Sequence, residues 1–269
     1  MTSTKTFEYD VRVIAASKTE WGKRIATIVA RYPRFIHAEL MTHKDLSRNA
    51  SSSRAIPFKK MLKITRENMA APIFWGKNQP GMQAQEELTG FAKWAAIFLW
   101  HLTGHIVLSL AWVMSFTQVH KQIINRMIEP WTYINVQITA TNWERMLKLR
   151  VHEAAQPEFC ELGRAIRFAV NTAQYTTLRE GEWHLPWVSF AEQKSMPLQN
   201  AKLVSAARSA RLSYTPIGEV NMNVRKDLSL ATGLLEQFHL SPFEHQATPK
   251  KGKHANLDDW RNFRTELDH

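Results

Sequence analysis

Residues 42–54 read Thr-His-Lys-Asp-Leu-Ser-Arg-Asn-Ala-Ser-Ser-Ser-Arg, a polar stretch dense in hydroxyl groups and cations. It follows the more apolar stretch Phe35–Met41. Hydroxyl groups and backbone amides supply short donors for phosphate oxygens, and Lys44, Arg48 and Arg54 supply positive charge. An exposed basic loop or a nucleic-acid patch uses the same residue types. The spacing of the residues therefore has to separate these readings.

That spacing resembles the signature of flavin-dependent thymidylate synthases, Arg-His-Arg-x-x-Ser-x-Asn-x-x-Ser-x-Arg. The residues that match it in register are His43, Ser47, Asn49, Ser52 and Arg54. Thr42 and Lys44 replace the two leading arginines, and lysine keeps the charge but loses the flat bidentate fork. Ala50 stands where the family usually has Glu. These departures concern base recognition more than the fold.

Two further segments resemble helices of the same family. Met146–Arg150, followed by Ala155–Glu158, resembles a helix whose Arg faces the bound nucleotide, and Lys121–Pro130 resembles the helix that supplies an Arg to the nucleotide phosphate. The resemblance implies that Arg150 and Arg126 clamp a dianionic phosphate between them. A surface ion pair is the alternative for each arginine.

A third resemblance occurs in an unexpected order. Ala206–Tyr214 and His239–His245 resemble the Ala-Arg-x-Ser and His-x-Ser-Pro-Phe-Glu-His elements of the family, which ordinarily stand before the signature. Either the chain is circularly permuted, or a C-terminal unit replaces a lost N-terminal one. Permutation requires that the ordinary termini lie at the surface and close together. In the family the final His of this element lies by the flavin, which implies that role for His245; a structural capping His is the alternative.

The resemblance implies an α+β fold with a mixed sheet and long helices, in a homotetramer with shared active sites. Residues 1–190 would form the core, and residues 191–269 would complete the same domain. The implied activity is methylation of dUMP to dTMP with FAD, NADPH and methylenetetrahydrofolate, with methylation or hydroxymethylation of dUMP or dCMP for modified DNA as the alternative.

The implied catalytic residue is Arg150, which also binds substrate. The other implied substrate-binding residues are Glu39, Ser52, Arg54 and Arg126, and the implied cofactor-binding residues are His43, Lys44, Ser47, Asn49 and His245. Glu39 could compensate for the missing Glu at position 50 if its side chain turns inward.

Composition limits the class of protein. A chain of 269 residues with 44% hydrophobic residues can bury a substantial core. The single cysteine, Cys160, excludes an intramolecular disulfide and fits a reducing cytoplasm. Its flanking carboxylates, Glu158 and Glu161, disfavour a negatively charged thiolate, so we do not expect a nucleophile. The N-terminal sequence has no apolar core and predicts no signal peptide.

A formal charge of +11 and a pI near 9.8 indicate an anionic partner. The alternative from another class is a nucleic-acid-binding protein, in which Trp75, Trp183 and Trp187 could stack on bases. The sequence motifs favour a nucleotide over nucleic acid.

The stretch Trp94–Phe116 contains no Asp, Glu, Lys or Arg and is long enough to cross a bilayer. Polar residues interrupt it, and its tryptophans are scattered along it, where a membrane protein would place them at its ends. We interpret it as a buried helix pair or one long helix at an oligomer core, and expect no membrane partner. His101 and His105 have a spacing that metals use, but without a third ligand nearby we expect a core role and no metal.

Hydrophobic periodicity and turn residues predict the remaining elements. The predicted strands are residues 7–14 and Ile134–Ala140. The predicted helices are Trp21–Tyr32, Phe91–Met127, Thr141–Gln156 with a continuation past Pro157 to Val170, Ala201–Tyr214 and Asp227–Gln237. Thr141–Glu144 has capping-box spacing, Gly181–Pro186 predicts a turn, and Lys250–His254 predicts a charged loop.

Overall fold

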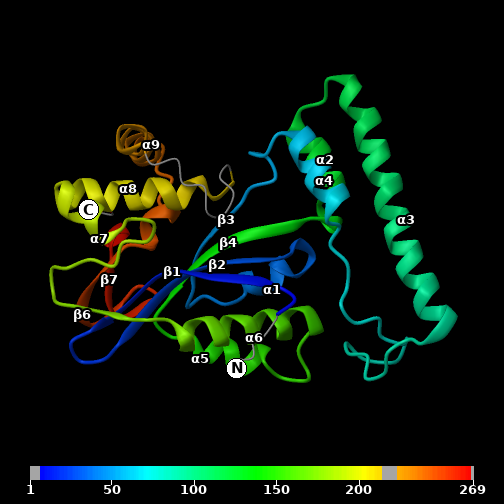
Figure 1. Cartoon of the computed structure of the whole chain (residues 1–269), viewed down its shortest axis with the longest axis horizontal. Coiled ribbons are helices and arrows are strands. Elements are labelled where there is room, and N and C mark those ends of the chain that lie inside the picture. The colour runs from blue at the N-terminus through cyan, green and yellow to red at the C-terminus, as the bar shows by residue number, and fades with distance from the viewer. Residues whose placement is uncertain (1–6, 214–222, 268–269) are drawn as a thin grey trace.

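The computed structural model describes residues 7–213 and 223–267, and it shows an α+β fold built on a mixed sheet (Figure 1). The sheet has five strands in the order β3-β4-β2-β1-β5. Their bounds are β1 Asp10–Thr19, β2 Arg24–Pro33, β3 Ser47–Ala50, β4 Tyr133–Ala140 and β5 Thr176–Leu178. β1 and β5 run parallel, and the other neighbours are antiparallel. The α+β class and the mixed sheet agree with the sequence-based expectation.

The helix predicted for Trp21–Tyr32 is wrong, because this stretch forms β2. The strand pairs with β1 on one side and β4 on the other, and nearly all of its side chains are buried. A strand covered on both faces reads as a continuous apolar run, which periodicity cannot separate from a buried helix. Gly22, at φ +89°, allows the tight turn that returns the chain from β1.

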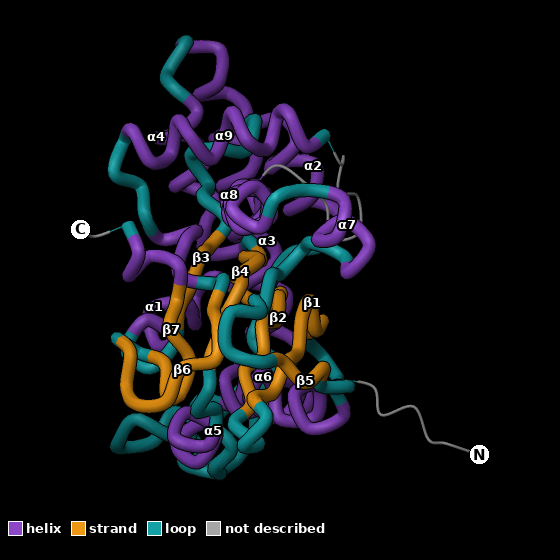
Figure 2. The backbone as a smooth tube through the Cα atoms, turned by 90° about the vertical axis from the view of Figure 1, so that its left-hand side faces the viewer, coloured by secondary structure: helices purple, strands orange, loops and turns teal. Residues whose placement is uncertain are grey.

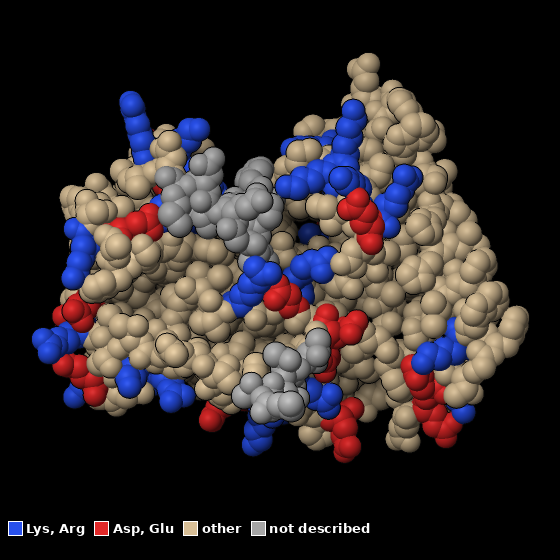
Figure 3. Space-filling model, in the orientation of Figure 1, with Lys and Arg blue, Asp and Glu red and all other residues tan. Residues whose placement is uncertain are grey.

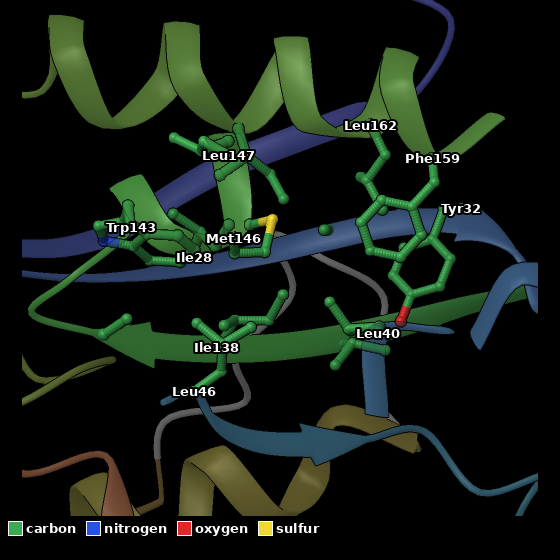
Figure 4. Close-up of a cluster of buried hydrophobic side chains, with 14 of the residues drawn as sticks. Ile28, Tyr32, Leu40, Leu46, Ile138, Trp143, Met146, Leu147, Phe159 and Leu162 are labelled. Carbon is green, nitrogen blue, oxygen red and sulfur yellow. The ribbon is translucent and has the colours of Figure 1, made fainter. Parts of the chain in front are cut away.

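One face of the sheet is covered by α5 (Glu144–Arg150) and α6 (Pro157–Thr172). Figure 4 shows Met146, Leu147, Phe159 and Leu162 from these helices pointing toward Ile28 and other buried side chains of the sheet. This cluster is the largest of the hydrophobic clusters among the described residues.

The single helix predicted from residue 141 onward is divided in two. Thr141 does not cap α5, because its hydroxyl accepts a hydrogen bond from the backbone N–H of Asp258 at 2.9 Å. Trp143 is the N-cap residue and makes no side-chain cap. Pro157 does not kink a continuous helix but opens α6 at its first position, where the missing N–H costs nothing.

The other face carries the C-terminal elements, as two views 90° apart show (Figures 1 and 2). They are α7 Phe190–Ser195, α8 Leu198–Ala210, α9 Val224–Glu236, β6 Ala247–His254 and β7 Leu257–Asn262. α8 and α9 confirm two predicted helices, although Tyr214, the predicted end of the first, lies outside the described residues. The loop predicted for Lys250–His254 is wrong: these residues belong to β6, whose charged side chains face solvent while β7 buries Leu257 and Trp260.

Three helices stand to one side of the sheet (Figure 1): α2 Phe58–Glu67, α3 Gly90–Met114 and α4 Lys121–Ile128. The short helix α1, His37–Met41, lies beside β2, with Leu40 in the core cluster. The single helix predicted for Phe91–Met127 breaks near Gln118, whose φ is +63°. The stretch Gly90–Thr117 is long and apolar enough to cross a membrane, and 17% of its most apolar window is buried in the chain. Of the two expected arrangements, the buried helix pair is wrong and the single long helix is confirmed: α3 is one long helix, largely exposed in the single chain, and its place at an oligomer core stays a prediction.

Candidate active site

A cavity of 880 Å³ lies where β3, the start of α4, the end of α8 and the segment after α9 meet. Its polar lining residues are Asn49, Ser52, Arg54, Gln122, Arg211, His239 and Ser241. These residues come from the signature segment, from α4 and from both C-terminal segments that resemble the same family. Figure 3 shows Lys and Arg side chains gathered around a hollow between the two halves of the molecule in this region. We call this cavity the β3 pocket.

Hydrogen bonds across the fold hold the walls of the β3 pocket together. The side-chain amide of Asn49 donates to the backbone carbonyl of Ser209 at 2.6 Å. Gln137 on β4 donates to the hydroxyl of the same serine at 2.9 Å. Ser209 is fully buried at the end of α8, so these bonds fix that helix against the sheet. The wall is thereby ordered before any ligand binds.

The positive charge in the β3 pocket comes chiefly from Arg54. Arg211 is held by a 3.1 Å ion pair with the buried carboxylate of Asp227. Arg208, from the same C-terminal segment, faces inward and binds Asp227 and Glu192 at 3.0 and 2.8 Å. Arg54 is exposed and makes no ion pair with any residue in the part of the chain that the structure describes. Its guanidinium is therefore available to an anionic ligand.

The described lining of the β3 pocket contains no carboxylate. Ala50 lines the pocket at the position where the resembling family usually has Glu. Glu39 does not compensate within one chain, because its side chain faces the guanidinium of Arg150 and does not line this pocket. An uncharged wall beside Arg54 suits phosphate oxygens, since no fixed negative charge repels them.

Arg150 forms a second cluster on the α5 side of the sheet. Its Nη1 donates to Glu39 Oε2 at 2.7 Å, and its Nε donates to His43 Nε2 at 2.9 Å. A third donor reaches the hydroxyl of Thr42 at 3.4 Å, and the guanidinium carbon lies 4.6 Å from the ring centre of Phe159. These contacts fix the orientation of the guanidinium.

The Arg150 cluster borders a cavity of 360 Å³ that Lys44 and Arg145 also line. Burial and the nearby charge of Arg150 hold the pKa of His43 below its usual range, so its ring is neutral and accepts at Nε2. Arg150 keeps two of its five N–H groups without a protein acceptor among the described residues. Those two donors are available to a ligand carbonyl or anion.

Ser47 and His245 are fully buried, unlike the other predicted site residues. Ser47 accepts from the side-chain amide of Asn256 at 2.8 Å. His245 Nδ1 lies 2.8 Å from the hydroxyl of Thr139, and its Nε2 is buried without a partner among the described residues. Burial lowers the pKa of His245 to about 3, so it is neutral at physiological pH.

His245 ends a chain of buried polar groups that crosses the sheet. Ser17 lies 2.9 Å from His184 Nδ1, and His184 Nε2 lies 2.8 Å from Thr27. Thr27 in turn lies 2.6 Å from Thr139. Burial lowers the pKa of His184 to about 3 as well. These hydrogen bonds link strands β1, β2 and β4 within one protein chain.

Arg126 and Arg150 do not meet within one chain. Arg126 is exposed on α4, whereas Arg150 lies on α5 in the cluster with Glu39 and His43. Figures 1 and 2 both place α4 and α5 on opposite sides of the sheet. A clamp formed by these two arginines therefore needs a second copy of the chain.

The structure also brings residues to the site that the sequence interpretation did not single out. Arg211, His239 and Ser241 line the β3 pocket, although the family resemblance identified only the segments that contain them. The three tryptophans suggested for base stacking are engaged elsewhere. Trp183 is buried, Trp187 donates to Gln137 at 2.7 Å, and Trp75 packs edge-on against Trp100.

Comparison with known proteins gives similarity at the level of structure. No family model and no curated protein sequence matches the chain. The chain is similar to the UMP/dUMP methylase PolB from Streptomyces cacaoi bound with 5-Br UMP, at 14% identity and a TM-score of 0.46, over 61% of this chain and 89% of that one. It is also similar to thymidylate synthase X (ThyX) from Helicobacter pylori with FAD and dUMP, at 14% identity and a TM-score of 0.39, over 54% and 67% of the two chains.

Proposed function

We propose that this protein is a flavin-dependent enzyme that methylates C5 of dUMP to give dTMP. The observation that carries the proposal is the β3 pocket. Asn49, Ser52 and Arg54 line it together with Arg211, His239 and Ser241, although the two groups lie more than 150 residues apart in sequence. The segments that resemble one enzyme family thus converge on one cavity despite their altered order.

The lining of the β3 pocket fits a phosphate-bearing ligand. Its volume lies within the range of small-molecule sites, and its polar groups are donors with no carboxylate among the described lining residues. In the proposal, Ser52 and Arg54 hold the phosphate of the nucleotide. Asn49, together with His43 and Lys44 on the other side of β3, holds FAD. Ser47 and His245 support these residues from the buried side.

Arg150 is the proposed catalytic residue. Glu39 and His43 hold its guanidinium, and its two remaining N–H groups donate to the pyrimidine carbonyl on which negative charge develops during reaction at C5. A donor that is already oriented stabilises that charge without reorganisation. FAD, NADPH and methylenetetrahydrofolate supply hydride and the one-carbon group when bound, so the protein contributes binding and orientation.

The active site is proposed to be shared between chains of a homotetramer in the cytoplasm. Arg150 would reach the base of a nucleotide bound in the β3 pocket of a neighbouring chain, because that pocket lies beside α4, which is apart from α5 in one chain. α3 offers a surface for the contact between chains. It is 25 residues long, about 38 Å, and it exposes an apolar stripe. The stripe includes Phe91, Trp94, Phe98, Leu102, Ile106, Leu110 and Val113. Light scattering of the protein in detergent-free buffer should give the mass of four chains, and a monomer would overturn the shared site.

A second candidate product is a modified pyrimidine nucleotide from dCMP or by hydroxymethylation. It is favoured by Ala50, which leaves the β3 pocket without the family's carboxylate, and by Glu39, which is bound to Arg150. A base whose polar groups lack partners in the site is rejected strongly, so the loss of one carboxylate changes base choice.

The flavin is tested first. Purified protein is denatured, and the supernatant is examined by absorbance and mass spectrometry for FAD. We expect one FAD per chain, or binding on titration of the apoprotein. Absence of both outcomes would remove the basis of the proposed function.

A further inference from the structure

A second large cavity, of 990 Å³, lies where β2 begins and β4 ends, beside α5 and α6. It shares no lining residue with the β3 pocket. Its wall carries the cationic side chains of Lys23, Arg24, Arg145, Lys148 and Arg167. Glu144 is the acidic residue among its described lining residues. We call this cavity the α5–α6 pocket.

Three of these cations have no carboxylate partner among the residues that the structure describes. The guanidinium of Arg24 lies 4.9 Å from the ring centre of Tyr175, and Arg167 donates to the backbone carbonyl of Leu147 at 3.4 Å. Lys148 makes no ion pair within the described chain. Two guanidinium groups are thus oriented by neutral partners, which leaves their charge uncompensated.

The other charges of the α5–α6 pocket do not cancel this excess. Lys23 lies 3.6 Å from Asp258, and Arg145 lies 3.2 Å from Asp45. Those two pairs are partly exposed and weak. Glu144 is the one carboxylate among the described lining residues, so the wall keeps a net positive charge.

Trp143 forms part of the inner wall of the α5–α6 pocket. Its side chain is 9% exposed, and its indole N–H is buried without an acceptor among the described residues. Figure 4 shows this nitrogen on the side of the ring away from Met146 and Ile28. Because the nitrogen itself is buried, it does not open onto the cavity, and the cations of the wall carry the indication of a ligand.

We propose that the α5–α6 pocket binds the multiply charged anionic part of a small molecule. The arginines suit phosphate or carboxylate groups, and the arrangement of several cations around a large cavity suits more than one such group. This pocket borders the Arg150 cluster, since Asn142 and Arg145 line both cavities. Resting on the proposed function, the natural ligand is one of the two co-substrates of dUMP: NADPH, bound through its phosphates, or the folate, bound through its glutamate carboxylates.

The test uses the full chain and inorganic pyrophosphate as a probe, measured by calorimetry at low and moderate salt. We expect saturable binding that weakens as salt rises. The double variant Arg24→Gln, Arg167→Gln should weaken it about tenfold or more, and so should the single variant Lys148→Gln, which breaks no contact of the fold. Arg164→Gln is the matched control, because this arginine lies one turn before Arg167 on α6 and does not line the pocket.

Competition then identifies the source of the anion. NADP⁺ displacing pyrophosphate assigns the pocket to the dinucleotide, and a folate triglutamate displacing it assigns the pocket to the folate. Displacement by neither overturns the assignment to these reactants. Binding that is absent, or equal in Lys148→Gln and Arg164→Gln, overturns the pocket itself. None of these measurements requires turnover or flavin, so failure here is distinct from failure of the proposed function.

Discussion

The side-chain amide of Asn49 donates to the backbone carbonyl of Ser209 across 2.6 Å, although 160 residues separate the two in sequence. The bond joins β3 to the end of α8, and Arg211 and His239 line the same cavity beside it. The segments that line the β3 pocket are therefore neighbours in space although they are far apart in sequence. Residues that stand far apart in sequence form one wall of the pocket in which we propose that the nucleotide phosphate binds.

Arg54 should be the principal phosphate contact of the β3 pocket. Replacing it with Gln removes one charge-assisted contact, so dUMP affinity should fall about tenfold to a hundredfold, which corresponds to roughly 1.5–3 kcal/mol. Affinity is measured by calorimetry, with FAD content determined in the same preparation. Arg66→Gln, an exposed change on α2, is the control and should bind dUMP normally. Equal affinity in both variants would contradict the placement of the phosphate.

Arg126 and Arg150 should act in one site but from different chains. Arg126→Gln and Arg150→Gln homo-oligomers should each lose most activity, because each site then lacks one arginine. Co-expressed hybrids should recover part of it, since some sites then receive both native arginines. The recovered rate is compared with that of a mixture of the separately folded variants. Hybrids as inactive as their parents would show that the two arginines do not meet across chains.

The buried histidines should make the fold sensitive to acid. Burial lowers the pKa of His184 and His245 to about 3, below about 6.5 in the unfolded chain. Between these values the unfolded state binds protons that the folded state does not, so the free energy of unfolding falls as pH falls. The loss is up to about 1.4 kcal/mol per pH unit for each histidine, and it vanishes above the unfolded pKa.

Urea unfolding at several pH values between 4.5 and 7.5 measures this dependence. His245→Gln should reduce the slope below pH 6 by about one proton, even if the variant is less stable at every pH. The slope above pH 7 should stay the same. A variant with the slope of the wild type at low pH would show that His245 takes up its proton in the folded state.

Cys160 should be dispensable for the chemistry. It is buried on α6, and it lines none of the cavities described above. Cys160→Ser should keep its FAD and most of its turnover, with a stability loss of about 1 kcal/mol from burying a hydroxyl. Turnover is measured alongside a thermal melt. A folded, FAD-containing variant without activity would point to covalent thiolate chemistry.

The sequence predicted the chemistry-bearing segments better than their local structure. Spacing identified Asn49, Ser52 and Arg54, which share one pocket, and β-branched residues identified β4. The helix prediction for the buried stretch Arg24–Pro33 was wrong, because a strand covered on both faces lacks the alternation of apolar and polar residues that identifies strands. The loop prediction for Lys250–His254 was wrong because the exposed part of a hairpin can consist of charged residues.

The geometry of the site could not be predicted from the sequence, for a different reason. No local pattern shows that Glu39 and His43 hold Arg150, or that Arg208 turns inward while Arg211 lines the pocket, because these pairings depend on tertiary packing. Circular permutation itself remains a prediction. The contact of β3 with α8 is what such a permutation requires, because it keeps the same neighbours while changing the order of segments.

The most direct measurement is the mass of the product. The enzyme is incubated with FAD, NADPH, methylenetetrahydrofolate and either dUMP or dCMP, and the nucleotides are analysed by mass spectrometry beside the Arg54→Gln variant. We expect dUMP to gain the mass of one methyl group, only when FAD is present and much more slowly in the variant. Hydroxymethyl addition, or product from dCMP alone, would support the alternative product. If neither substrate gives a modified nucleotide while FAD is bound at saturation, the proposed function is wrong.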